Sequence, residues 1–578
     1  MMTTLMNLMI TETSDNLKYL IIDIETNGLL NTLDKSKEVT KVFCIVTKDL
    51  ETGEVVTYTQ EECYTKFKPS SNTIFIGHNL LSYDLRVLAK IIGYKHPASK
   101  CLDTLILSQL FNPIRDKGNG LAAWGERLGF PKMPSPNFDY YTDQMLEYCI
   151  NDVELTEKVY HHLMSKEKKN FSDESIRREH IFRYYMDQQE RNGFYFDLPF
   201  ATTFLARLTD ECIDIEHKLQ EIFPTVITKR FHKKTGKPIK DIIDKFNPAS
   251  RKQIAERLME KGWKPTLKTE KGNIIVNEDV LAKITGIPES EAILKYLLLQ
   301  KRASQVKSWI KYCDPDTYRV HGRIKTLGTV STRCSHLDPN VAQTPATYSP
   351  YGDECRTCWT VEDVKNYALL GCDASQLELR VLAHYMKDKK YIHQILHGDI
   401  HTTNQQMAGL ETRDQAKTFI YALIYGAGAA KIGYIMNKSA RHGQDTKNKF
   451  LENVPALNSL LEKVHASAER TSMVKGLDGR YFHVRSLHSS LNVLIQGGGA
   501  IICKEWLIQI MKEINRLQLD AKPVANIHDE IQFEVRKENA EELGEITKTC
   551  MKRVEKILGL DCPLESEYKI GTTWAMTH

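Results

Sequence analysis

The sequence predicts a protein of several domains with mixed α/β and α+β structure. Its 578 residues are enough for about three or four domains, each with its own core. The apolar run 368–370 predicts a buried strand leading to Asp373, and helical periodicity begins at Gln376. A second run, 524–535, predicts a hairpin with Asp529 at its tip. Two carboxylates could therefore meet over one sheet, although a single Asp at a strand end is more often a turn former.

Acidic residues also follow a predicted strand near the N-terminus. Residues 18–24 are an apolar run, and Asp23 and Glu25 project to the same side because strand side chains alternate. The segment 77–92 places Asp84 at the start of a helix with apolar periodicity. The Asp23 and Glu25 pair can bind a divalent cation; the alternative is a strand end with solvated acids.

Composition is that of an ordinary globular protein. The net charge of +4 neither demands nor excludes nucleic acid, so a nucleic-acid surface must come from local clusters of Lys and Arg. The 13 Cys form no disulfide framework, which indicates free thiols in a reducing compartment. Cys355 and Cys358 form one CxxC, but no second ligand pair follows, which argues against zinc. The N-terminus is typical of neither a signal nor a transit peptide, and no later apolar run appears long enough to span a membrane.

A third pattern lies between the two acidic ones of the C-terminal half. In the segment 413–428, RDQAKTFIYALIYGAG, four side chains recur every fourth residue and share one helix face: Arg413, Lys417, Tyr421 and Tyr425. A stripe of this kind alone is usually a solvated helix face. The apolar residues between them fall elsewhere and can be buried.

These three patterns together carry a specific resemblance. DASQLELR at 373–380, R-x3-K-x3-Y-x3-YG in 413–426, and HDE at 528–530 resemble, in this order, the three polymerase motifs of family A DNA polymerases. Longer runs are similar to the replicative polymerases of short-tailed bacteriophages: GDIHTTN at 398–404, KFLENVPAL at 449–457 and KGLDGR at 475–480. The resemblance implies DNA-templated DNA synthesis, expected to replicate a viral genome.

The resemblance also implies the domain organisation. A ribonuclease H-like exonuclease domain would precede a right-hand polymerase domain, with the boundary in the charge-dense segment 161–180. The expected ranges are 1–168 for the exonuclease domain and 169–578 for the polymerase domain, with the thumb at about 181–320, the palm at about 321–385 and 501–578, and the fingers at about 386–500.

By the same resemblance, Asp373 and Asp529 would hold two Mg²⁺ ions, for which Mn²⁺ can substitute. Glu530 is expected to be a neighbour of the site rather than a ligand. Glu378 would exclude a ribose 2′-hydroxyl. The residues implied in nucleotide binding are His401, Arg413, Lys417, Tyr421, Tyr425 and Glu378, and those implied in DNA binding are Arg333, Asn340, Gln343, Gln496 and His528.

Tyr148 and Asp152, four residues apart, share one face of another predicted helix. With Asp23, Glu25 and Asp84 they resemble the DEDDy proofreading 3′–5′ exonucleases. The four carboxylates would hold two metal ions, and Tyr148 would orient the attacking water.

The expected partners are primer–template DNA and deoxynucleoside triphosphates, in the host cytoplasm if the chain is phage-encoded, with a helicase–primase as a further candidate. Some phage relatives recruit thioredoxin through a long thumb insertion, but the stretch 223–246 is short and basic here, which makes that partner doubtful. Its run KRFHKKTGK is expected to be a loop, either solvated or following DNA phosphates. Two alternatives are a repair polymerase without proofreading and a non-catalytic nucleic-acid-binding scaffold; the complete set of carboxylates argues against both.

Overall fold

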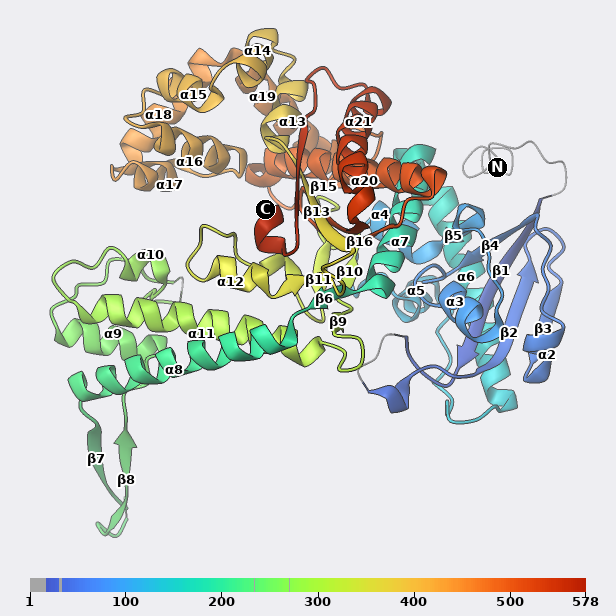
Figure 1. Cartoon of the computed structure of the whole chain (residues 1–578), viewed down its shortest axis with the longest axis horizontal. Helices are drawn as coiled ribbons and strands as arrows, with labels where there is room; N and C mark the ends of the chain where they lie inside the picture. The colour runs from blue at the N-terminus through green and yellow to red at the C-terminus, as the bar shows by residue number, and fades with distance from the viewer. Residues whose placement is uncertain (1–16, 31–33, 233, 270) are drawn as a thin grey trace.

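The computed structural model describes residues 17–30, 34–232, 234–269 and 271–578. The N-terminal segment, interpreted above as neither a signal nor a transit peptide, lies largely outside these residues. Figure 1 shows an N-terminal α/β unit beside a larger C-terminal part in which a sheet is surrounded by three groups of helices. The predicted fold class, α/β and α+β with several domains, agrees with this arrangement.

The N-terminal unit is built on a five-stranded sheet in the order β3-β2-β1-β4-β5. The strand β1 is antiparallel to β2 and parallel to β4, and β4 is parallel to β5. The long helix α6 packs on β1 and β2. The bounds are β1 Lys18–Thr26, β2 Val42–Asp49, β3 Val55–Thr59, β4 Thr73–Gly77, β5 Cys101–Asp103, α2 Glu61–Thr65, α3 Asp84–Val87, α4 Thr104–Phe111, α5 Leu121–Leu128 and α6 Asp143–His162.

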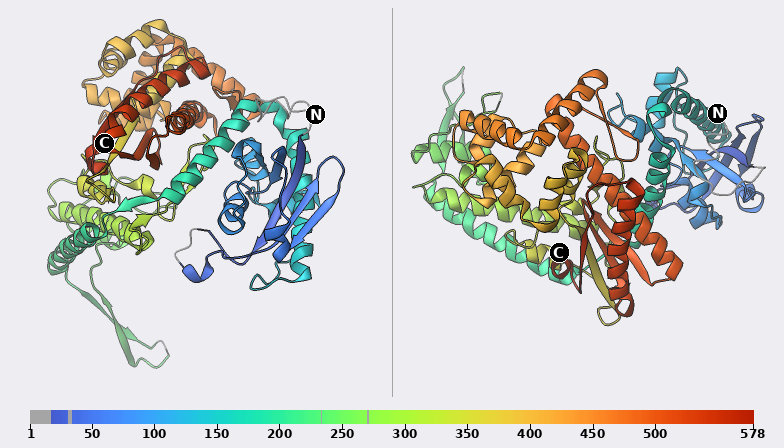
Figure 2. Two further views of the ribbon diagram at one scale, coloured as in Figure 1. Left: turned by 45° about the vertical axis from the view of Figure 1, so that its right-hand side comes forward. Right: turned by 90° about the horizontal axis from the view of Figure 1, so that it is seen from above.

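Helix α7, Asp173–Asn192, runs along the boundary between this unit and the rest of the chain (Figure 2). It begins at Ser172, whose side chain accepts a hydrogen bond from the Ser175 N–H. Polar and charged residues on α7 are buried, including Arg178, Glu179 and Asp187. Buried charged residues need partners, and those of α7 come from the N-terminal unit and from the C-terminal part of the chain. Helix α7 is therefore part of the packed structure of both rather than a linker between them.

The palm is a four-stranded antiparallel sheet in the order β16-β17-β13-β18. Both predicted elements are confirmed, the strand before Asp373 and the hairpin around Asp529. Helices α20 and α21 pack against each other beside this sheet, and the limit of 500 expected for the fingers falls inside α20. The bounds are β13 Tyr367–Ala374, β16 Ala521–Ile527, β17 Glu530–Arg536, β18 Ser566–Gly571, α12 Gly352–Thr357, α13 Leu377–Met386, α20 Ser490–Leu517 and α21 Ala540–Leu558.

The helical stretch Leu487–Leu517, which contains α20, is long and apolar enough to cross a membrane by length and composition, a run that the sequence analysis did not expect. In the structure, 94% of its most apolar window is buried inside the protein. A helix that is apolar on all sides is typical of a central core position, and α20 occupies one.

Six further helices form the fingers region, and three short sheets complete this part of the chain, one of which, β14–β15, packs on α19 and α20. The helix predicted over 413–428 ends at Ile424, because Gly426 adopts a left-handed conformation with φ of +78°. The bounds are α14 Lys389–His397, α15 Ile400–Ala408, α16 Arg413–Ile424, α17 Ala429–Ile435, α18 Ala440–Asn453, α19 Pro455–Thr471, β6 Phe194–Phe196, β9 Arg319–Val320, β12 Trp359–Thr360, β10 Arg323–Lys325, β11 Ser335–Leu337, β14 Met473–Lys475 and β15 Tyr481–His483.

The thumb region consists of two long packed helices and two shorter ones: α8 Leu198–Ile222, α11 Glu289–Tyr312, α9 Arg251–Glu260 and α10 Glu278–Leu281. Ser250 caps α9, because its side chain accepts a hydrogen bond from the Gln253 N–H. The prediction of a loop between α8 and α9 is wrong, because the chain there forms a hairpin of β7 Val226–Phe231 and β8 Pro238–Asp244. β-Branched and aromatic residues on both sides of a turn that contains Gly236, with φ of +64°, favour this structure.

Candidate active sites

The palm sheet brings the two predicted carboxylates together. Asp373 lies near the end of β13, and Asp529 lies in the turn between β16 and β17. The two segments are joined where the Ala374 N–H donates to the Asp529 carbonyl at 3.1 Å. Partial loss of hydration, with the neighbouring carboxylates of Asp529 and Glu530, raises the pKa of Asp373 to about 8. Burial raises the pKa of Asp529 as well.

Glu530 lies directly opposite Asp373 in the sheet but is occupied by protein partners. Its carboxylate accepts a hydrogen bond from Gln532 at 2.7 Å and pairs with His578 at 3.0 Å. Burial alone would raise the pKa of Glu530, but His578, Arg356 and the Trp574 indole hold it below its ordinary value. This carboxylate is therefore already neutralised, whereas those of Asp373 and Asp529 are not.

Glu378, on the first turn of α13, links two other predicted residues. Its carboxylate accepts a hydrogen bond from Arg333 at 2.7 Å and from the Tyr425 hydroxyl at 3.0 Å. Gln496 lies next to Tyr425, and His528 next to Arg333, whose charge and the burial of His528 lower the pKa of its imidazole. These five side chains come from five separate segments and form one surface beside Asp529.

The helix α16 presents its cationic stripe at the edge of this surface. Arg413 is paired with Asp399, the N-cap of α15, through contacts of 2.6 and 3.2 Å. His401 is buried with its Nδ1 atom unpartnered, and its ring centroid lies 6.4 Å from that of Tyr421. Burial and Glu378 raise the pKa of Tyr421 to about 12, so its hydroxyl stays protonated near neutral pH. Lys417 is exposed on the same helix.

Asn340 and Gln343 belong to a different surface. Asn340 is the N-cap of the short helix η6, Val341–Gln343, and Gln343 is its last residue. Both side chains are exposed. The Gln343 carbonyl accepts a hydrogen bond from Gln305 of the thumb helix α11 at 2.7 Å. They therefore lie at the junction of palm and thumb, and no contact within the described residues joins them to the Glu378 group.

The second predicted site assembles in the N-terminal unit. Asp23 and Glu25 lie on β1, Asp84 begins α3, and Tyr148 and Asp152 lie on α6. Burial and the mutual repulsion of the carboxylates raise the pKa of Asp23 to about 8 and that of Glu25 to about 10. The pKa values of Asp84 and Asp152 are also raised, mainly by burial. Three buried acids and the half-buried Asp23 thus share one site with too little positive charge to neutralise them.

Two residues of this site were missed by the sequence analysis. Lys132, in the segment before α6, pairs with Asp152 at 2.5 Å and lies over the Tyr148 ring at 4.7 Å from its centroid. The Cys149 thiol donates to Asp23 Oδ2 at 3.5 Å. Cys149 could have been found, because it follows Tyr148 on the helix; Lys132 comes from a segment without periodicity and gave no signal. Asp399 lies in the run GDIHTTN at 398–404, but the sequence analysis assigned no role to this residue.

The acids of the N-terminal site fit a divalent cation. One ligand atom each from Asp23, Glu25 and Cys149 lie within 4.8 Å of one another. Asp152 Oδ1 is buried without a hydrogen-bond partner. A buried oxygen of this kind is costly unless something else satisfies it, and carboxylate oxygens are the ligands that Mg²⁺ prefers. The palm site offers the same type of donor in Asp373 and Asp529.

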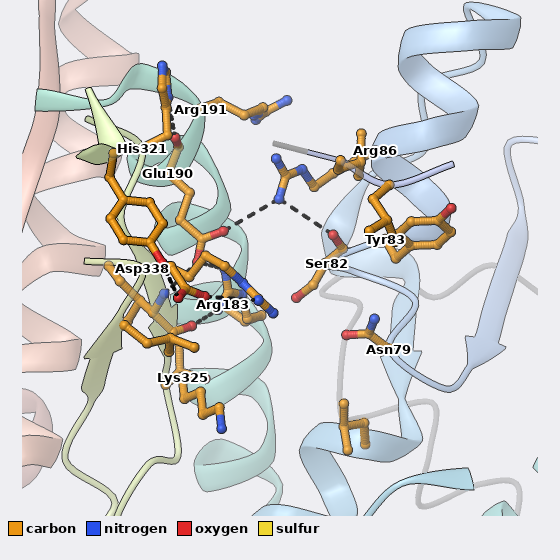
Figure 3. A pocket seen from close by; sticks show the side chains of 18 of the residues that line it. Asn79, Ser82, Tyr83, Arg86, Arg183, Glu190, Arg191, His321, Lys325 and Asp338 are labelled. Atoms are coloured by element: carbon orange, nitrogen blue, oxygen red, sulfur yellow. Dashed lines mark hydrogen bonds and ion pairs between the residues drawn. The ribbon is translucent and has the colours of Figure 1, made fainter. Parts of the chain in front are cut away.

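A cavity of about 940 Å³ separates the N-terminal unit from the C-terminal part of the chain. Figure 3 shows Arg86 reaching across it from α3 toward Glu190 of α7. Arg86 lies 3.5 Å from Glu190 and 3.6 Å from Asp187, and all three side chains are buried. Asn79 and Tyr83, close to Asp84 in the chain, line the same cavity. The cavity therefore lies next to the segment that carries Asp84, but none of the four acids lines it.

The fold and the palm site are those of a template-directed polymerase, with paired acids at the end of an antiparallel sheet and a helix that carries Arg413 and Lys417. The model of DNA polymerase family A matches residues 223–576, and the chain belongs to this family. It is 32% identical to the DNA-directed DNA polymerase of Escherichia phage T7, over 97% of this chain and 100% of the relative. It is 26% identical to DNA polymerase I of Aquifex aeolicus, over 97% of this chain and 96% of that relative.

A solved structure, the POL domain of Pol1 from M. smegmatis in complex with DNA primer-template and dNTP, has the same fold. Its TM-score is 0.81 at 18% identity, with 97% of this chain and 96% of that chain covered. The expectation of a multidomain family A polymerase is confirmed, and its function is DNA-directed DNA synthesis in replication.

Removing one palm carboxylate should stabilise the metal-free protein. A carboxyl group whose pKa is raised by folding lowers the stability of the folded state once the pH exceeds the ordinary pKa of that group. For Asp373, this loss of stability reaches its full size only above about pH 8. Asp373→Asn should therefore raise the melting temperature in chelator, on the order of 1–2 °C, and more at pH 8 than at pH 5. Asp210→Asn, at an exposed position of α8, should leave it unchanged. A lower melting temperature for Asp373→Asn at both pH values would contradict the repulsion.

Proposed function

We propose that this chain replicates DNA, that of a virus in the host cytoplasm, and proofreads its product with a 3′–5′ exonuclease on the same polypeptide. The single observation that supports proofreading is the convergence of four carboxylates, three buried and one half-buried, on one site, although they come from three separate segments. Buried acids that repel one another destabilise a fold, so their gathering points to a site for cations. The four are Asp23, Glu25, Asp84 and Asp152.

In the polymerase site, Asp373 and Asp529 would hold two Mg²⁺ ions, with Mn²⁺ able to substitute. When bound, the ions lower the pKa of the primer 3′-hydroxyl and neutralise charge on the departing pyrophosphate. The backbone contact between β13 and the β16–β17 turn keeps the two carboxylates together. Glu530, held by Gln532 and His578, positions the strand beside them.

The fingers helix would bind the incoming deoxynucleoside triphosphate. Arg413 and Lys417 carry positive charge to the phosphates, and His401 offers its unpartnered Nδ1 atom. Arg413 is paired with Asp399 in the absence of nucleotide. This pair is exposed and bidentate, so a triphosphate can replace the carboxylate by offering the guanidinium a similar oxygen pair.

The surface around Glu378 would face the base pair being formed. Arg333, Gln496 and His528 would contact the primer–template in the minor groove, where acceptors are common to all base pairs. Tyr425 would stack at the templating position and release Glu378 as the fingers close. Asn340 and Gln343, at the thumb junction, would contact the duplex farther from the chemistry.

In the exonuclease site, the four carboxylates would hold two metal ions, and Tyr148 would orient the attacking water. Lys132 keeps the Tyr148 ring and the Asp152 carboxylate in register through its contacts to both. The cavity lined by Asn79 and Tyr83 lies between the N-terminal unit and the rest of the chain, and the unpaired primer end would pass along this boundary. Helicase–primase remains a candidate partner, and the short thumb stretch argues against thioredoxin.

The two activities should separate by mutation. Asp373→Ala should reduce primer extension by about 10³-fold or more, the scale on which loss of one preorganised electrostatic contact acts, and should leave single-strand degradation intact. Asp23→Ala with Glu25→Ala should do the reverse. Both proteins are assayed for extension and degradation with Mg²⁺ and with chelator. Loss of both activities in either folded variant would refute the assignment of two sites.

Glu378 should control sugar selection. Shortening it removes the group expected to occupy the space of a 2′-hydroxyl, so Glu378→Ala should incorporate ribonucleotides roughly 10-fold or more efficiently relative to deoxynucleotides. Glu378→Gln keeps the volume and should retain most of the selection. Competition between matched ribo- and deoxynucleotides measures both. Unchanged selection in Glu378→Ala would exclude Glu378 from this role.

Tyr421 should make the enzyme tolerant of dideoxynucleotides. The residue lies one turn after Lys417, and its hydroxyl can replace the missing 3′-hydroxyl of such a nucleotide near the leaving phosphate. Tyr421→Phe should restore discrimination, up to roughly 10⁴–10⁵-fold, the limit for a site left with an unpaired polar group. Competition between deoxy- and dideoxynucleotides on both proteins tests this. Strong rejection by the unmodified chain would refute the placement of Tyr421 at the sugar.

A further inference from the structure

A cysteine thiol lies among the acids of the N-terminal site. Cys149 is fully buried on α6, and its thiol donates a hydrogen bond to Asp23 Oδ2 at 3.5 Å. One ligand atom each from Cys149, Asp23 and Glu25 lie within 4.8 Å of one another. The carboxylates of this site suit Mg²⁺, but Mg²⁺ takes oxygen ligands and not sulfur. A sulfur atom at this position therefore changes which cations the site can hold.

Asp152 supplies a fourth donor on the same side of α6 as Cys149. The two residues are three positions apart, and side chains at this spacing are neighbours on a helix face. The Asp152 carboxylate lies near Asp23, since its charge is, after burial, the main cause of the raised pKa of Asp23. Asp152 Oδ2 pairs with Lys132, whereas Oδ1 is buried and has no hydrogen-bond partner. A cation bound between α6 and β1 would satisfy this oxygen, which is otherwise costly to bury.

The spacing of the donors fits a zinc ion. In a tetrahedral site with Zn–S bonds of about 2.3 Å and Zn–O bonds of about 2.1 Å, a sulfur and an oxygen ligand lie about 3.6 Å apart. In the structure, Cys149 Sγ and Asp23 Oδ2 are 3.5 Å apart. Zinc also accepts a mixture of thiolate and carboxylate ligands. The donors therefore suit a thiophilic cation in type and in distance.

We propose that Cys149 and three acids of this site hold one thiophilic divalent cation of the zinc type, and that this occupancy blocks degradation of the primer end. The three acids are Asp23, Glu25 and Asp152. The thiol would bind as a thiolate and release its proton to solvent. The half-buried Asp23 leaves the site accessible to ions.

The blocking role rests on the proposed exonuclease function and on the number of ligands. A zinc ion with four protein ligands is closed, whereas a catalytic zinc ion keeps one position open for water. Four protein donors would leave no position for the attacking water. Zinc would also occupy Asp23 and Asp152, which are expected to hold the Mg²⁺ ions for degradation. The same acids would therefore support degradation in Mg²⁺ and prevent it in zinc.

The first test measures binding without any enzyme activity. Cd²⁺, which has ligand preferences close to those of zinc, absorbs in the ultraviolet by charge transfer when a thiolate binds it. The purified full chain should show this absorption on titration with Cd²⁺, and added Zn²⁺ should remove it. Serine can keep the hydrogen bond to Asp23 but is not a soft donor. Cys149→Ser should therefore bind the cation roughly 100-fold or more weakly, because loss of even an outer partner of a metal ligand costs about 10–100-fold.

The matched control is Cys63→Ser. Cys63 is also fully buried in the N-terminal unit, on α2, and its thiol also donates to an oxygen, the Tyr58 carbonyl at 3.4 Å. This variant should keep the absorption of the unmodified chain. Loss of the absorption in Cys149→Ser alone assigns the cation to the acid site. Equal absorption in Cys149→Ser and the unmodified chain would overturn the proposal, because other cysteines would then hold the cation.

The second test measures single-strand degradation in excess Mg²⁺ with added Zn²⁺, and each rate is compared with that of the same protein in Mg²⁺ alone. At a zinc concentration between the two dissociation constants, the unmodified chain and Cys63→Ser should lose most of their rate, and Cys149→Ser should keep most of its own. Equal inhibition of all three proteins would overturn the blocking role. Absence of degradation by the unmodified chain in Mg²⁺ alone would refute the proposed exonuclease, while the Cd²⁺ titration would still decide the cation site.

Discussion

A buried ion cluster on α7 is the interaction on which the rest of the structure depends. Glu179 accepts hydrogen bonds from Arg480, in the loop after β14, and from Lys504 of α20, the latter at 2.7 Å, and Arg480 also contacts Asp478 at 2.7 Å. All four side chains are buried, so each charge depends on the others, and removal of one partner from such a cluster costs about 3–5 kcal/mol. The same helix receives Arg86 from the N-terminal unit. One helix therefore fixes the distance between the two acidic sites.

The sequence predicted the local parts of each site because their signals are local. Asp373 follows an apolar run, Asp529 lies between two strands, and Tyr148 and Asp152 share a helix face; the structure has each element where the pattern placed it. Partners that depend on tertiary contacts gave no such signal. Lys132 approaches Asp152 from an irregular segment, and nothing in its surroundings shows which acid it will meet.

The thumb illustrates a second limit. The run KRFHKKTGK is polar and contains Gly236, features typical of a loop, and the β-branched residues that define its strands lie mostly outside it. Strand pairing places Ile227 opposite Ile243, sixteen positions away in the chain, and this contact is what turns a polar stretch into a hairpin. The same argument explains Asn340 and Gln343. The resemblance implied a shared role in DNA binding, but their position depends on the packing of η6 against the thumb.

The acids of this protein fall into two groups: those neutralised by partners within the protein, which stabilise the structure, and those without enough partners, which lie in the two candidate sites. Glu530, Asp478 and Glu179 are buried, yet each is held by cationic or hydrogen-bonding partners of the protein itself. Asp373 and Asp529, and the acids around Asp23, lack enough such partners, and their pKa values are raised in consequence. A fold tolerates this cost only where its stability comes from elsewhere, here from the ion cluster on α7 and the apolar α20. The carboxylates of the two sites are therefore available to bind cations, because the acids of the scaffold between the sites are already paired with its Arg and Lys side chains.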